Sequence, residues 1–88
     1  MNVTFDKSFS KALDKINNKQ LLQKIEKVIV QCENASIISE ITNLKKLVGF
    51  KSYYRIKISD YRIGIEIIGK NIHFITVCHR KDVYKIFP

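Results

Sequence analysis

Hydrophobic positions in the first third of the chain follow first the period of a strand and then that of a helix. Val3 and Phe5 alternate with polar neighbours, which predicts a short strand. After a capping residue at Asp6 or Ser8, apolar residues recur on one helical face: Phe9, Ala12, Leu13 and Ile16. Two asparagines interrupt this pattern. A second helix is predicted beyond them, with one apolar stripe: Leu21, Leu22, Ile25, Val28, Ile29 and Cys32.

The second half of the chain changes to a period of two. Residues 35–52 are irregular, with Leu44 and Leu47 as apolar anchors. From Tyr53 onward apolar and polar residues alternate, which predicts three strands joined by short turns: residues 53–58, 61–68 and 72–79. The tail is expected to add a short turn or helix that carries Tyr84.

These elements together predict an α+β fold in the order β-α-α-β-β-β. The sheet is expected to be antiparallel and twisted, with the N-terminal helical hairpin packed on one face. No repeat, low-complexity run or linker divides the chain, so residues 1–88 are interpreted as a single domain.

The first hairpin of the predicted sheet gathers positive charge on one face. Ser59 and Asp60 are interpreted as its two-residue loop. Lys57 then stands directly opposite Arg62, with Arg55 two residues along on the same face. Like charges in this position destabilise a sheet by about 0.2–1 kcal/mol, whereas converging cations suit the binding of a phosphate. The alternative is that these side chains splay into solvent, and a register shift of one residue would separate the pair.

Positive charge is concentrated in the second half of the chain. The formal net charge is +8, and residues 44–88 hold ten basic residues against three acidic ones. The first 43 residues are nearly neutral, with six basic residues against five acidic ones. A basic half beside a nearly neutral one favours a polyanionic partner on one surface, with nucleic acid or the ribosome foremost.

Several other classes of site are disfavoured by the residues present. Cys32 and Cys78 are isolated and lack metal-ligand spacing, so we interpret them as small core residues in a reduced cytoplasm. No apolar run approaches the ~20 residues of a membrane span, and the start lacks the apolar segment of a signal peptide. No glycine-rich phosphate loop, Ser/His/Asp set or Cys/His cluster is present, so no cofactor, metal or membrane partner is expected.

Two stretches of the C-terminal half resemble a known family. The run LKKLVGFKSYYRIKISDYRIGIEI, followed by a strand ending in CHRKDVY, resembles the RelE/ParE superfamily of bacterial toxins from type II toxin–antitoxin systems. The resemblance covers nearly the whole chain and implies a RelE-like fold and the RelE branch, a ribosome-dependent, metal-independent mRNA interferase. Such toxins enter the ribosomal A site. There the 2′-hydroxyl of one nucleotide attacks the neighbouring phosphate, which leaves a cyclic phosphate and a free 5′-hydroxyl.

The resemblance also implies roles for individual residues. Arg62 is expected to bind the scissile phosphate, Arg80 to act at the leaving group, and Lys57 to activate the 2′-hydroxyl as a base or electrostatically. Tyr84 is expected to stack on a base and orient the nucleotide, with a plain packing residue as the alternative. Arg55 matches a basic position of the family, although arginine is a poor proton acceptor. Five lysines are expected to bind rRNA and mRNA backbones: Lys45, Lys46, Lys51, Lys81 and Lys85.

Two further residues keep alternative interpretations. His79 has the side chain best suited to acid/base work near neutral pH, but it can equally be a strand-end residue that only forms hydrogen bonds. Glu66 either forms a salt bridge with Arg55 or acts as a base.

Two other functions stay open at this level. One is a ParE-type toxin that inhibits DNA gyrase by binding. The other is a non-catalytic or decayed toxin that acts as a binding module through its basic face. A toxin is expected to have a cognate antitoxin protein that masks the cationic face, and to meet operator DNA only through that complex. The RelE branch adds the ribosome and mRNA as partners.

Overall fold

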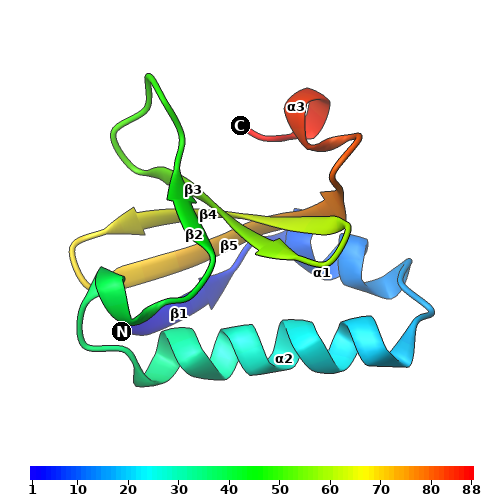
Figure 1. Cartoon of the computed structure of the whole chain (residues 1–88), viewed down its shortest axis with the longest axis horizontal. Helices are drawn as coiled ribbons and strands as arrows, with labels where there is room; N and C mark the ends of the chain where they lie inside the picture. Colours follow the sequence, from blue (N-terminus) through cyan, green and yellow to red (C-terminus); the bar gives the residue numbers. More distant parts are fainter.

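The computed structural model describes residues 1–88 as a five-stranded sheet with helices on both sides (Figure 1). The helices are α1 (Lys7–Asp14), α2 (Lys19–Asn34) and α3 (Val83–Ile86), with a 3-10 turn, η1 (Ile38–Glu40). The strands are β1 (Asn2–Phe5), β2 (Leu44–Lys46), β3 (Tyr53–Ile58), β4 (Tyr61–Ile68) and β5 (Asn71–His79). Their spatial order is β1-β5-β4-β3-β2.

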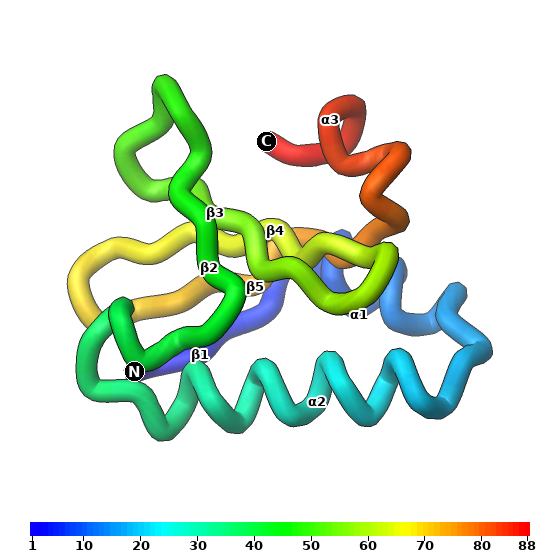
Figure 2. Tube along the Cα trace, viewed as in Figure 1, coloured from blue at the N-terminus to red at the C-terminus, as the bar shows by residue number.

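The predicted α+β class, element order and three-strand meander are confirmed, and two details of the sheet differ. The sheet is mixed rather than antiparallel, because β1 pairs in parallel with β5. Figure 2 shows this pairing as the blue N-terminal strand running beside the orange β5. The segment expected to be irregular also contains β2, which pairs antiparallel with the start of β3. Hydrophobic periodicity reports which face a strand buries, but it carries no information on the direction of strands far apart in the chain.

The helical hairpin is held by the capping residues and apolar stripes that the sequence predicts. Asp6 is the N-cap of α1, and the Asn18 side chain caps α2 by accepting a hydrogen bond from the Leu21 N–H. Both helices cover one face of the sheet, where they complete the main core with their buried side chains: Phe9, Leu21, Ile25 and Cys32. Leu44 also packs against this core, as predicted.

The opposite face of the sheet carries a second, smaller apolar cluster. Cys78, Val83 and Phe87 are buried there, with Leu47 and Tyr53 packed around them. The C-terminal α3 therefore lies across the sheet from α2, as the red helix at the top of Figure 1 shows. The predicted helix carrying Tyr84 is thus present, and it is anchored by its apolar neighbours.

Both cysteines are buried and unpaired, which confirms their interpretation as core residues. Burial raises the pKa of the Cys32 thiol to about 11 and also raises the pKa of Cys78, so neither forms the reactive thiolate readily.

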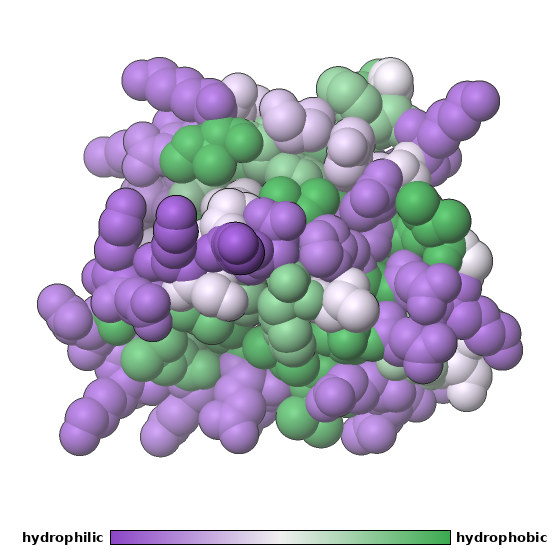
Figure 3. Space-filling model, turned by 180° about the vertical axis from the view of Figure 1, so that it is seen from behind, coloured by the Kyte–Doolittle hydropathy of each residue, from purple (hydrophilic) through white to green (hydrophobic).

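The face seen from behind is largely hydrophilic. Purple hydrophilic side chains project around its rim, with green hydrophobic patches between them (Figure 3). None of the helices combines the length and the apolar composition that crossing a membrane requires.

Candidate functional site

The β3–β4 hairpin has the register that the sequence predicts. Lys57 pairs with Arg62, and Arg55 pairs with Gly64. The two-residue loop that sets this register contains Ser59 in a left-handed conformation (φ 50°). The like-charged pair therefore exists, on the face turned away from α1 and α2.

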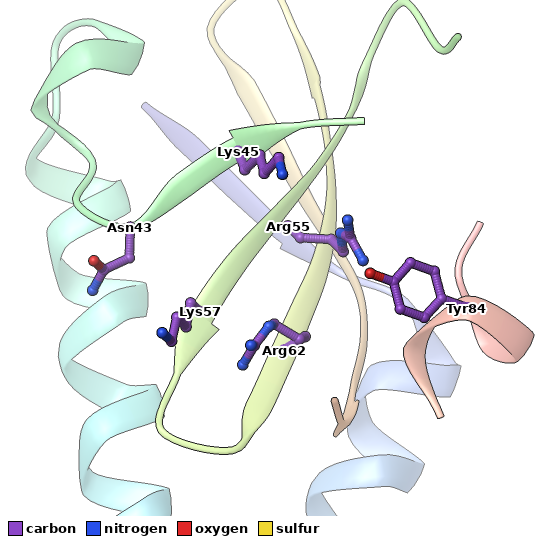
Figure 4. A pocket seen from close by; sticks show the side chains of 6 residues that line it. All are labelled: Asn43, Lys45, Arg55, Lys57, Arg62 and Tyr84. Carbon is purple, nitrogen blue, oxygen red and sulfur yellow. The ribbon is translucent and has the colours of Figure 1, made fainter. Parts of the chain in front are cut away.

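A hollow of about 300 Å³ lies over this hairpin. We call it the cationic hollow, and its lining comes from β2, β3, β4, α3 and the residue before β2: Asn43, Lys45, Arg55, Lys57, Arg62 and Tyr84 (Figure 4). Lys45 joins it because β2 places Lys45 directly beside Arg55 in the sheet. Four basic side chains from three neighbouring strands thus meet in one place.

No carboxylate neutralises this charge. The ion pairs of the structure join His73 to Asp6 and Arg80 to Asp60, and none includes a basic residue of the cationic hollow. Arg62 is held instead by backbone, since its guanidinium donates to the Ser59 carbonyl (3.1 Å) and to the Tyr61 carbonyl (2.9 Å). These two bonds fix the guanidinium and leave its charge free to act on an anion.

Tyr84 closes one side of the cationic hollow from α3. Its side chain is 79% exposed, and the Arg55 Cζ lies 5.0 Å from the centre of its ring. Figure 4 shows the Arg55 guanidinium pointing toward the Tyr84 hydroxyl. Hydrogen bonding to Arg55, and then the Arg55 charge, lower the pKa of the Tyr84 phenol below its ordinary value. Lys45 and Arg62 add smaller contributions in the same direction.

The remaining basic candidates lie outside the cationic hollow. Arg80 follows β5, where its Nε lies 4.0 Å from the Asp60 carboxylate. Four of the five lysines predicted to bind RNA line no part of the hollow, although all four are exposed: Lys46, Lys51, Lys81 and Lys85. The sequence correctly places basic residues on the surface but does not show which of them converge.

His79 and Glu66 are also placed away from the cationic hollow. His79 lies on the helix-covered face, where its ring packs edge-to-face on Tyr61 with centroids 5.5 Å apart. Its Nδ1 accepts a hydrogen bond from the Lys81 N–H (3.2 Å). Glu66 accepts a hydrogen bond from Ser52 Oγ (2.9 Å), and the expected salt bridge with Arg55 is not formed.

Sequence reasoning overlooked Asn43 as a lining residue. Asn43 has a positive φ of 60° just before β2, a backbone conformation that asparagine tolerates better than most residues. The one sequence signal at this position is an asparagine directly before the apolar residue Leu44. Such an asparagine predicts a turn, not a binding site. No group of three or more His, Cys, Asp or Glu side chains is arranged to hold a metal ion.

The cationic hollow is therefore suited to bind a phosphate group. Its four basic side chains supply charge from several directions, and the Tyr84 ring offers an exposed aromatic face beside them. Single-stranded nucleic acid is the polymer that presents phosphates and unstacked bases together.

Comparisons with known proteins identify the family of the chain. The model of the family described as ParE toxin of type II toxin–antitoxin system, parDE, matches residues 3–84. Toxin RelE3 of Methanocaldococcus jannaschii is 38% identical over 89 residues, covering 100% of both chains. The crystal structure of the RelB–RelE antitoxin–toxin complex from Methanococcus jannaschii is similar with a TM-score of 0.82 and 36% identity, covering 97% of this chain and 99% of that one. The archaeal RelE–RelB complex from Pyrococcus horikoshii shares the fold, with a TM-score of 0.73 at 23% identity over 90% of this chain and 93% of that one.

Proposed function

Because the chain belongs to the RelE branch of the RelE/ParE superfamily and is a toxin of a type II toxin–antitoxin system, we propose that it stops translation by cutting mRNA in the ribosomal A site. The observation that carries the proposal is the uncompensated cationic hollow with Tyr84 at its side. Four unpaired basic side chains in one place do not stabilise the fold. They do stabilise a transition state in which the phosphate carries two negative charges.

In the proposed reaction the nucleophile belongs to the substrate. The 2′-oxygen forms a bond to phosphorus, the bond from phosphorus to the 5′-oxygen breaks, and the products are a cyclic phosphate and a 5′-hydroxyl. The proton of the 2′-hydroxyl must leave and the 5′-oxygen must gain one. Arg62 and Arg55 stabilise the phosphate charge. The Lys57 ammonium, opposite Arg62 in the sheet, stabilises the forming 2′-oxyanion while the 2′-proton passes to water.

The proton for the leaving oxygen is assigned to Tyr84. An arginine keeps its proton at any physiological pH, so Arg80 can stabilise negative charge but donates poorly. The phenol of Tyr84 has a lowered pKa and adjoins the cationic hollow, which makes it the better proton donor and also a stacking surface for a base. Arg80 supports the leaving group after releasing Asp60, an exposed contact of 4.0 Å that is weak enough to exchange.

A cognate antitoxin is proposed as the partner that controls this activity. The similar toxin of Methanococcus jannaschii was crystallised as a RelB–RelE antitoxin–toxin complex. The antitoxin of this chain is expected to mask the cationic hollow with acidic residues, and the pair is expected to bind operator DNA through the antitoxin.

The test is cleavage of mRNA on purified ribosomes, with the new 5′ ends mapped by primer extension. We expect cleavage within A-site codons by the parent and a loss on the order of 10²–10³-fold in R62M or Y84F. K27M, on the exposed α2 surface, serves as the matched charge control and should cut like the parent. If a K57M/R62M double variant stops growth as strongly as the parent, the proposal is wrong.

Inhibition of DNA gyrase is the second candidate, favoured by the family whose model matches residues 3–84. DNA damage that depends on gyrase, with mRNA left intact, would establish it in place of RNA cleavage.

A further inference from the structure

A second groove, of about 470 Å³, adjoins the cationic hollow. The two share Lys45, Arg55 and Tyr84, so they form one continuous surface. The far side of this groove is built by the loop between β2 and β3, which projects on the same side of the sheet as α3 (Figure 1). The role of Phe50 and Val48 on that loop is not explained by the phosphate site.

The loop presents apolar side chains to solvent. Val48 is 94% exposed and Phe50 is 44% exposed. One edge of the Phe50 ring is fixed, because Phe50 packs edge-to-face on Tyr53 (5.7 Å between centroids), which packs in the same way on Phe87 (5.4 Å). An aromatic ring held on one side and open on the other is a ready surface for stacking.

The base of the loop is also well ordered by hydrogen bonds. The Leu47 N–H donates to the Tyr53 carbonyl (2.9 Å), and the Ile67 N–H donates to the Ser52 carbonyl (2.9 Å). Ser52 Oγ donates to Glu66 (2.9 Å), which gives Glu66 a structural task away from the chemistry. A preordered loop loses little conformational entropy when a ligand binds.

We propose that this groove is a second nucleotide subsite, which takes the base one nucleotide beyond the two that flank the scissile phosphate and stacks it on Phe50. The inference rests on the proposed function, since it assumes that the cationic hollow holds that phosphate. Lys45 and Arg55 lie at the junction of the two spaces and bind the connecting backbone. RNA fits this surface because it alternates phosphates with flat aromatic bases, and the groove alternates cations with an exposed ring in the same way.

The test measures binding of two short RNAs by fluorescence anisotropy at low salt. Each carries a 2′-deoxy nucleotide at the attacking position so that it cannot be cut. One is a dinucleotide, which reaches only the cationic hollow, and the other is a tetranucleotide, which also reaches the groove. We expect F50A and F50L to weaken tetranucleotide binding by roughly 5- to 100-fold and to leave dinucleotide binding unchanged. F50W should bind like the parent. I68A is the matched control, because Ile68 is 60% exposed and lines neither space.

Three outcomes overturn the inference. One is unchanged tetranucleotide binding in both F50A and F50L, and another is an equal loss for both RNAs. The third is a Phe50 variant that binds RNA normally but escapes inhibition by the antitoxin, which would assign the groove to that protein. F50L keeps most of the apolar volume of the side chain, so we expect it to fold like the parent. Urea denaturation of F50L checks that the fold is intact. If the Phe50 subsite is wrong, the parent protein still cleaves mRNA on ribosomes. If RNA binding depends on Phe50 but the parent does not cleave mRNA on ribosomes, only the proposed cleavage reaction is refuted.

Discussion

The ring of Phe87 occupies the space where a side chain on Gly64 would begin. A Cβ on Gly64 would lie 2.6 Å from Cγ of Phe87, closer than real contacts of this kind. Phe87 is 3% exposed and follows α3 directly, while Gly64 lies in β4 opposite Arg55. The contact therefore seats α3, and with it Tyr84, beside the cationic hollow.

G64A is expected to dislodge Phe87 and α3. Overpacking of this kind costs about 1–3 kcal/mol, and the short helix is the part that can move. We expect mRNA cleavage to fall and the pKa of Tyr84 to return toward its ordinary value, because the Arg55 contact is lost. Alkaline titration and the cleavage assay measure the two effects.

A smaller residue at position 87 should restore the fit. The G64A/F87L double variant is expected to recover part of the cleavage rate and part of the Tyr84 pKa shift, whereas F87L alone leaves a cavity. A Tyr84 titration that is identical in G64A and the parent would show that this contact does not position α3.

R55M is expected to raise the pKa of Tyr84, because Arg55 is the main cause of its lowering. A lowered phenol pKa in the folded protein stabilises the fold fully above the ordinary pKa of 10.0, and this stabilisation is lost as the pH falls through the folded value. Through its effect on Tyr84, R55M should therefore not change the free energy of unfolding at neutral pH. At alkaline pH it should remove the stabilisation that ionised Tyr84 provides. Tyrosinate absorbance against pH, with the spectrum of Y84F subtracted, provides the measurement. An unshifted curve would contradict the assignment.

K57M is expected to stabilise the fold while weakening phosphate binding. Removing one member of the Lys57–Arg62 pair relieves their electrostatic repulsion, which should raise the free energy of unfolding by about 0.2–1 kcal/mol. Urea denaturation at low salt should show the gain, and high salt should reduce it by screening. Thermal stabilisation by added inorganic phosphate should fall in the same variant. K27M is the control, and lower stability of K57M at low salt would refute the repulsion.

H79Q is expected to leave the pH profile of mRNA cleavage unchanged. His79 lies on the helix-covered face beside Tyr61, and its Nδ1 is occupied by the Lys81 N–H. Loss of a general acid or base costs about 10²–10⁴-fold, so an effect of that size in H79Q would show that the imidazole reaches the substrate.

Much of the fold could be predicted because its signals are local. The capping residue Asn18 and the apolar stripe of α2 lie within a few residues of one another, and the short turn at Ser59 sets the hairpin register. The direction of β1 could not be predicted in this way, since its partner β5 lies some seventy residues later, as the pairing of Asn2 with Asn71 shows.

The sequence by itself determined which residues share a face, and therefore that Lys57 meets Arg62 with Arg55 beside them. It also determined that the C-terminal half carries most of the net positive charge. Only the tertiary structure decided that Lys45 and Tyr84 join this cluster while Arg80 and His79 stay outside it. The physical reason is that hydrophobic periodicity and turn length relate residues that are neighbours in the chain. The packing of Phe87 on Gly64 depends instead on how two distant surfaces fit together, which no local pattern encodes.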